Sequence, residues 1–171
     1  MASLAEDLLT VLRQEKEGYD GLYACAQQER EAVVARDLER LTEVTSEAAD
    51  RSSQLKNLEK QRVQILKDMS VVLGHDAEIL SVSRIIELLA AKQPEESRAL
   101  EKAKNDLVTS ATQMQFLNQQ NQILLQQAME MVDFDLTLYK SLRQAPETAN
   151  YDRNAENSGD LLGGSGFDSR Q

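Results

Sequence analysis

Apolar residues recur at helical spacing through the first half of the chain. One set runs from residue 4 to residue 33, and its members are Leu4, Leu8, Val11, Leu12, Tyr19, Leu22, Ala26 and Val33. The next set follows a heptad repeat, and its members are Leu41, Val44, Ala48, Leu55, Leu58, Ile65, Met69 and Val72. Steps of three and four residues place side chains on one face of an α-helix. The pattern therefore predicts two long amphipathic helices, the first capped by Ser3.

The phase of the pattern slips near Arg36 and Asp37, which indicates a helix hairpin with its turn at this point. Asp37 has the side chain that an N-cap of the second helix needs. Because no Gly or Pro marks the turn, one continuous helix on the order of 100 Å long is the alternative. Gly18 and Gly21 interrupt the first helix and indicate either a bend or a close helix contact.

Gly74 is suited to the left-handed cap that ends the second helix. Ser83 is expected to cap a short helix that Pro94 closes, and a third long helix should run from Glu95 to about residue 143. We therefore expect an all-α antiparallel bundle of three long helices and one short helix over residues 1–143. Residues 144–171 are rich in Asn, Ser, Gly and Asp, which predicts a flexible, disordered tail.

The third long helix carries two apolar stripes. The first stripe consists of Leu117, Leu124, Ala128, Met131, Leu138 and Leu142, and the second stripe consists of Leu125, Met129, Val132, Leu136 and Tyr139. Together the two stripes span more than the roughly 100° of helix surface that a helix usually buries against the core of its own protein. Such a helix either lies inside a bundle or keeps one side for another protein, and we interpret the second stripe as a binding surface.

Two asparagines lie on these stripes. Asn121 falls on the first stripe, where a buried amide can fix helix register. Asn118 falls on the second stripe, where it could hydrogen-bond a partner. Exposure to solvent is the alternative for both side chains.

Composition narrows the class of protein. Aromatic residues make up only 4% of the chain and Trp is absent, which is typical of long helices packed through aliphatic seams. The net charge of −10 argues against nucleic-acid binding. The chain has no visible signal peptide and no run of about 18 apolar residues, so membrane insertion is not expected. With Cys25 as the only cysteine, we expect a cytoplasmic protein.

Candidate catalytic groups are scarce. His75 is the only histidine and lies beside Gly74 at a helix end, where a surface or capping role is expected. Cys25 lies next to the apolar face of the first helix and is expected to act as a small hydrophobe. No Cys/His spacing suits zinc, and no Gly-rich loop follows a strand. The sequence predicts a protein with no metal and no cofactor that is not an enzyme.

Three segments resemble the FlgN family of bacterial flagellar export chaperones. Residues 33–62 contain VVARDLERLTEVTSEA and LKNLEKQR, which match an apolar pair, an Asp, heptad leucines and a closing basic residue. Residues 116–131, FLNQQNQILLQQAMEM, are similar to the family's N-x-x-N-x-x-L-L stretch. Tyr151-Asp152 with Gly159 resembles the family's short tail motif. These segments occur in the family's order and cover most of the chain.

The resemblance implies a cytosolic chaperone of the flagellar type III export pathway, whose clients are the hook–filament junction proteins. It also implies that the carboxyl-terminal part binds the terminal helices of the client, and that a tail tyrosine engages the cytosolic domain of the export gate. Gate docking then falls on Tyr151, and client binding falls on Asn118, Leu125, Met129, Val132, Leu136 and Tyr139. A structural homodimeric coiled-coil or adaptor protein, in which dimerisation consumes both stripes, is the alternative.

Overall fold

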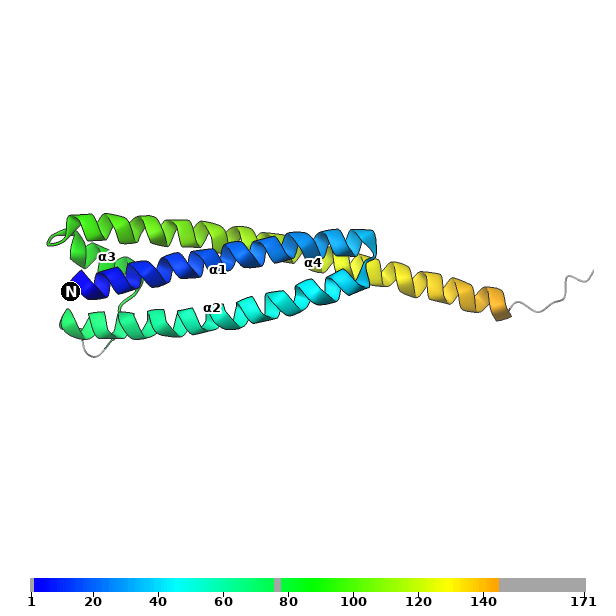
Figure 1. The fold of residues 1–171 in the computed structure, drawn as a ribbon, viewed down its shortest axis with the longest axis horizontal. Coiled ribbons are helices and arrows are strands. Elements are labelled where there is room, and N and C mark those ends of the chain that lie inside the picture. Colours follow the sequence, from blue (N-terminus) through cyan, green and yellow to red (C-terminus); the bar gives the residue numbers. More distant parts are fainter. Residues whose placement is uncertain (1, 76–77, 145–171) are drawn as a thin grey trace, which may run out of the picture. The chain divides into compact units, whose positions relative to one another are not determined.

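The computed structural model describes residues 2–75 and 78–144, and these residues form four helices. The helices are α1 (Ala2–Ala35), α2 (Leu38–Val72), α3 (Val82–Ala90) and α4 (Pro94–Gln144) (Figure 1). The chain divides into two units, residues 1–130 and residues 131–171, and α4 contributes to both. The predicted all-α fold of three long helices and one short helix is confirmed. The predicted tail lies outside the described residues, apart from Gln144 at the end of α4.

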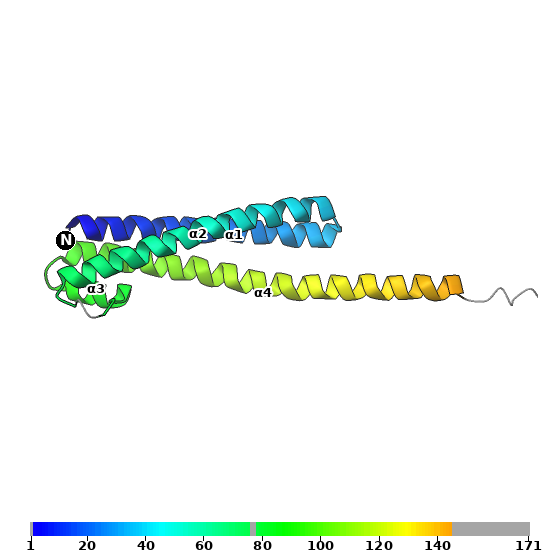
Figure 2. The ribbon, with the colours of Figure 1, turned by 90° about the horizontal axis from the view of Figure 1, so that it is seen from below.

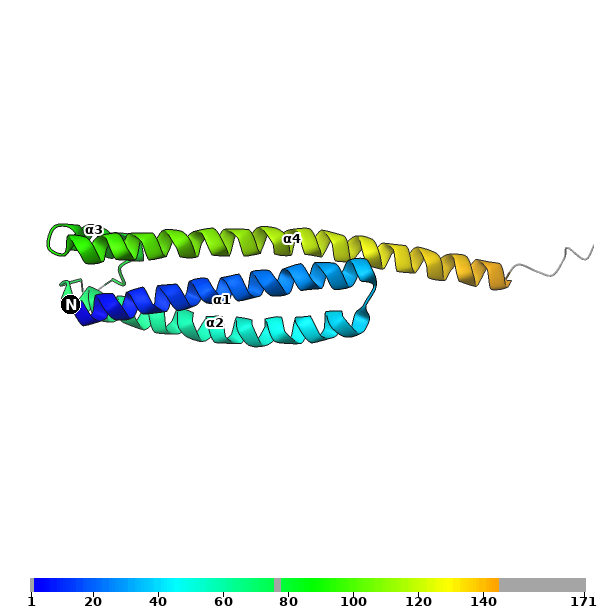
Figure 3. The ribbon, with the colours of Figure 1, turned by 45° about the horizontal axis from the view of Figure 1, so that its top comes forward.

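In the first unit, α1 and α2 form an antiparallel hairpin, and the part of α4 up to residue 130 runs back along it (Figures 1 and 3). The α1–α2 turn is a Schellman motif. The N–H of Arg36 donates to the carbonyl of Val33 across 3.1 Å, and the N–H of Asp37 donates to that of Ala32 across 2.9 Å. Arg36 has the left-handed backbone conformation, with φ of 57°. The predicted hairpin is confirmed, and the single continuous helix is excluded.

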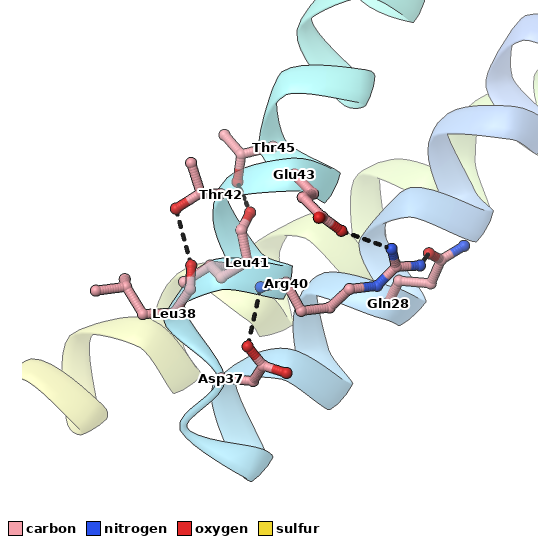
Figure 4. Close-up of polar contacts among 8 residues, drawn as sticks. All are labelled: Gln28, Asp37, Leu38, Arg40, Leu41, Thr42, Glu43 and Thr45. Carbon is pink, nitrogen blue, oxygen red and sulfur yellow. Dashed lines mark hydrogen bonds and ion pairs between the residues drawn. The ribbon is translucent and has the colours of Figure 1, made fainter.

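Asp37 ends this turn and begins α2. Its Oδ1 accepts a hydrogen bond from the backbone N–H of Arg40 across 2.9 Å, which confirms the predicted N-cap (Figure 4). The guanidinium of Arg40 then reaches Glu43 on its own helix and Gln28 on α1. One exposed side chain therefore links the two helices beside the turn.

The core of the first unit lies where α3 packs among the three long helices, at the end of the bundle where α1 begins (Figure 2). All four helices supply buried side chains to this core, and Leu80 adds one from the segment before α3. The buried side chains of the core are Ala5, Leu8, Leu12, Leu66, Met69, Leu80, Ile85, Ile86, Leu89, Leu100 and Ala103. Two buried serines satisfy backbone groups at its edge. The hydroxyl of Ser70 accepts from the N–H of Leu80 across 2.8 Å, and that of Ser97 donates to the carbonyl of Ile86 across 3.0 Å.

The glycines inside α1 lie against side chains of α2. A Cβ on Gly18 would lie 3.1 Å from Cδ1 of Leu55, and one on Gly21 would lie 2.5 Å from Nη1 of Arg51. Of the two predicted explanations for these glycines, the close helix contact is the one that the structure supports. Gly74 has the left-handed conformation expected of it, with φ of 80°.

Two predicted helix caps are wrong. Ser3 lies inside α1, which begins at Ala2 and not at Leu4. The N-cap of α3 is Ser81 and not Ser83, because Val82 packs against the core and so belongs to the first turn of the helix. The hydroxyl of Ser83 instead accepts a hydrogen bond from Nζ of Lys104 across 2.9 Å.

Candidate protein-binding surface

The first stripe faces the bundle along the part of α4 that belongs to the first unit. Leu117 is buried, and Leu124 and Ala128 are half-buried. Asn121 lies between them and is 9% exposed, with its Nδ2 donating to the carbonyl oxygen of Ala26 on α1 across 2.6 Å. The prediction that Asn121 is buried and bonded in the seam is therefore confirmed, and solvent exposure is excluded for this side chain.

The second stripe lies on the solvent side of the same part of α4. Leu125 is 42% exposed and Met129 is 61% exposed. Asn118 is also exposed, and no hydrogen bond of its side chain is found within the described residues. Phe116 and Ile123, which belong to neither stripe, are similarly exposed. This unit therefore presents several large apolar side chains that its own bundle does not cover.

In the second unit, every described side chain from residue 131 to residue 143 is exposed. Three members of the second stripe, Val132, Leu136 and Tyr139, are 50–56% exposed. The guanidinium carbon of Arg143 lies 5.1 Å from the centre of the Tyr139 ring, at the distance of a cation–π contact. Tyr139 is therefore held by a neighbour on its own helix.

Sequence reasoning missed part of this exposed apolar surface. Three members of the first stripe, Met131, Leu138 and Leu142, are as exposed as the second stripe, and so is Phe134. The length of the predicted third long helix was the feature of the sequence that could have indicated this larger exposed surface. At 51 residues, α4 is much longer than α1 and α2, which have 34 and 35, so these helices cannot cover all of its apolar side chains.

Reactive groups in the described residues do not gather into a catalytic arrangement. His75 is exposed, with its backbone N–H bonded to the carbonyl of Ser70. Cys25 is buried, and burial raises the pKa of its thiol. Within residues 2–75 and 78–144, no group of three His, Cys, Asp or Glu side chains is placed to hold a metal ion. None of the helices in these ranges has both the length and the apolar character needed to cross a bilayer.

A helical bundle with large exposed apolar side chains along its longest helix is typical of a protein-binding module. The chain belongs to the FlgN family, because the model of this family, described as FlgN protein, matches residues 1–159. FlgN is a family of chaperones and not of enzymes, and membership makes this protein a flagellar export chaperone of the type III pathway. Neither a curated protein nor a solved structure matches the chain.

The matched range extends beyond the described residues. Tyr151, the predicted gate-docking residue, lies inside the match but outside the part of the chain that the structure describes. The client-binding and gate-docking roles of individual residues therefore stay predictions.

Proposed function

We propose that this chaperone binds the terminal helices of hook–filament junction proteins through the second stripe, acting in the cytoplasm. The observation that supports the proposal is the exposure of Leu125 and Met129 in one unit and of Val132, Leu136 and Tyr139 in the other. While bound, the client's apolar helix face is covered and cannot self-associate. Release follows delivery to the cytosolic domain of the export gate.

Helix-in-groove recognition fits the chemistry of this surface. An amphipathic client helix would lay its apolar face on side chains spaced by three and four residues. Covering the exposed parts of five such side chains removes roughly 400 Å² of apolar surface from water, or about 10 kcal/mol of gross stabilisation. Association costs are of similar size, so additional apolar contacts are needed for tight binding. Leu142, three residues beyond Tyr139 on the adjoining side of α4, is exposed and can supply one such contact. Met129 adds a flexible side chain that adapts to more than one client.

The test is a double substitution of exposed apolar residues, Leu125→Asp with Val132→Asp. We expect loss of co-purification with junction proteins, while far-UV helicity and the melting temperature change little because both side chains are exposed. Val63→Asp with Val71→Asp on α2 is the matched control, since these valines are exposed to a similar degree. Retained client binding in the α4 variant, or equal loss in the control, contradicts the proposal.

Gate docking by Tyr151 is tested separately from client binding. Tyr151→Ala is expected to bind junction proteins normally and to lose binding to the purified cytosolic domain of the gate. Phe167→Ala is the control, because it removes a tail aromatic outside the range matched by the family. Normal gate binding by Tyr151→Ala would exclude the assignment.

The homodimeric coiled coil remains the competing function, because exposed Met131, Leu138 and Leu142 could also form a seam with a second copy. Sedimentation equilibrium distinguishes the two. If the exposed side chains bind client, the protein should be a monomer, or a dimer that the client dissociates. If they form a structural coiled coil, the protein should be a tight dimer that the client leaves unchanged.

A further inference from the structure

Two hollows follow one another between α1 and α4 in the first unit, where the two helices lie side by side and run in the same direction (Figure 3). The first hollow, of about 260 Å³, lies between residues 13–16 of α1 and residues 99–106 of α4. The second hollow, of about 480 Å³, lies between residues 23–31 and residues 113–120. At a rise of about 1.5 Å per residue, their centres are about 20 Å apart along the helices. We call the two hollows together the α1–α4 groove.

Cations predominate in the first hollow, although acidic residues outnumber basic ones by 29 to 19 in the whole chain. The charged side chains that line it are Arg13, Lys16, Lys102 and Asp106. Lys16 forms an ion pair with Asp20, whereas no ion pair of Arg13 or Lys102 is found within the described residues. An occupant that covered these two cations without pairing them would pay for their desolvation. The first hollow is therefore complementary to carboxylates.

The second hollow has a different chemistry. Tyr23, Phe116 and Leu117 supply its apolar surface, and Phe116 is 61% exposed. Its one cation, Arg30, is balanced by its one carboxylate, Glu31, and three glutamines complete the lining. An apolar side chain placed on Phe116 would leave water, and the glutamine amides can hydrogen-bond polar atoms beside it.

Asp20 lies between the two hollows, and its charge is compensated. Burial acts to raise the pKa of this carboxyl, but hydrogen bonds from Lys16 and from Ser110 on α4 hold the pKa below its usual value. The Asp20 carboxylate therefore repels an acidic occupant less than an unpaired carboxylate would.

The shape and the size of the groove favour one kind of occupant. A straight groove between two helices fits a third helix, and such a helix spans 20 Å with about 13 residues. A helix about 10 Å wide that covered roughly 30 Å of the groove would have a footprint of roughly 300 Å². A stable interface needs about 800 Å² on each partner, so the groove favours a transient partner over a permanent dimer of this chain.

We propose that the α1–α4 groove is a second protein-binding site, and that its partner is an amphipathic helix with carboxylates near one end and an apolar side chain about 13 residues away. The carboxylates pair with Arg13 and Lys102, and the apolar side chain packs on Phe116. Phe116 and Asn118 are separated by about 160° around α4, so the groove does not overlap the second stripe. The site is therefore independent of the client-binding surface proposed above.

Binding of a designed helix to the full chain tests the inference. The probe is a fluorescent peptide of about 20 residues with a cluster of Glu at its amino end and Leu about 13 residues further on, and a comparison peptide has Lys in place of Glu. Fluorescence anisotropy should show binding of the acidic peptide and much weaker binding of the basic one. Arg13→Glu with Lys102→Glu should weaken binding of the acidic peptide by about tenfold or more, because attraction becomes repulsion. Phe116→Ala should weaken it by about fivefold.

Lys56→Glu with Lys60→Glu is the matched control for charge. Both lysines are exposed on α2, and the substitution changes the net charge of the chain by the same amount as the groove variant. Its affinity for the acidic peptide should stay within about twofold of the wild type. Leu125→Asp with Val132→Asp should also stay within that range, which separates this site from the second stripe.

Four results would overturn the inference. The acidic peptide fails to bind, or the basic peptide binds equally well. Binding persists in Arg13→Glu with Lys102→Glu, or the α2 control loses as much affinity as that variant. A wild-type dimer that the groove variant dissociates in sedimentation equilibrium also overturns it, because the occupant is then a second copy of this chain.

Discussion

Arg62 on α2 donates its Nε–H to Oε1 of Glu15 on α1 across 2.9 Å, in the middle of the hairpin seam. The side chain of Glu15 is 2% exposed and that of Arg62 is 28% exposed. The other carboxylate oxygen, Oε2, is buried without a partner among the described residues. Burial raises the pKa of Glu15 even though Arg62 acts in the opposite direction. Desolvation of the carboxylate therefore outweighs the attraction of the guanidinium, so the pair adds little net stability to the bundle.

Removing one partner of this pair should cost more than removing both. Arg62→Leu leaves the Glu15 carboxylate buried and alone, so the free energy of unfolding should fall by about 2–4 kcal/mol at neutral pH. Glu15→Leu combined with Arg62→Leu should recover most of that loss. Urea denaturation followed by circular dichroism measures all three proteins. Arg84→Leu is the control, since its pair with Glu87 is exposed on both sides and should contribute less than about 1 kcal/mol. A double variant as unstable as Arg62→Leu contradicts the interpretation.

The raised pKa of Glu15 also predicts a pH dependence of stability. The usual pKa of this group is 4.5, and the folded protein holds the proton to higher pH. Between these two pKa values the folded state binds more protons than the unfolded state, so the free energy of unfolding falls as pH rises through that window. Glu15→Gln does not titrate there. The stability of Glu15→Gln minus that of the wild type should therefore increase with pH across the window and then become constant. Urea denaturation at intervals from about pH 4 to about pH 8 measures this difference, and a difference that decreases with pH would disprove the assignment.

Arg36→Gly should stabilise the hairpin turn. A left-handed backbone costs an L-residue about 1–2 kcal/mol, whereas glycine adopts it freely. Glycine also gains freedom in the unfolded chain, so the net gain should be about 0.5–1 kcal/mol. The urea midpoint should rise accordingly. Ala49→Gly, at an exposed position inside α2, should lose about 1 kcal/mol and shows that glycine is not stabilising in general.

Ser70→Ala should weaken the connection between α2 and α3. The buried hydroxyl of Ser70 accepts from the N–H of Leu80 and donates to the carbonyl of Leu66 across 2.7 Å. Its removal leaves a buried N–H without an acceptor, which should lower the free energy of unfolding by about 1–3 kcal/mol. Faster hydrogen exchange at the amide of Leu80 would locate the loss. Ser53→Ala removes an exposed hydroxyl that bonds only a carbonyl of its own helix, and it should change stability by less than about 0.5 kcal/mol.

The helices could be predicted from the sequence because each long helix buries one side, and periodic burial leaves a periodic pattern. The hairpin was harder to distinguish from a continuous helix. Its left-handed residue is Arg36, whose side chain gives no sign of the turn, and only the phase slip and Asp37 indicate it. The Ser81 cap of α3 was missed because it depends on how Val82 packs against the core, which local sequence does not encode.

The extent of the exposed surface could not be predicted from periodicity. A repeat shows which residues share a side of a helix, but it does not show whether another helix lies opposite. The first stripe illustrates the difference, since Leu117 is buried and Leu138 is exposed although the same pattern contains both. The sequence did identify Asn121 as a seam residue, but its hydrogen-bond acceptor, the carbonyl of Ala26, lies on another helix and required the structure.

The helical state of residues 131–144 has a thermodynamic consequence. None of the side chains described there is buried, and a segment of this length cut free in water would be marginally helical at best. It is helical as the continuation of α4, whose costly first turn has already nucleated upstream. Fraying should therefore start at the carboxyl end and move inward on heating. A ligand that binds residues 131–144 binds a segment that is already helical, so little of its binding free energy is lost to ordering a random coil.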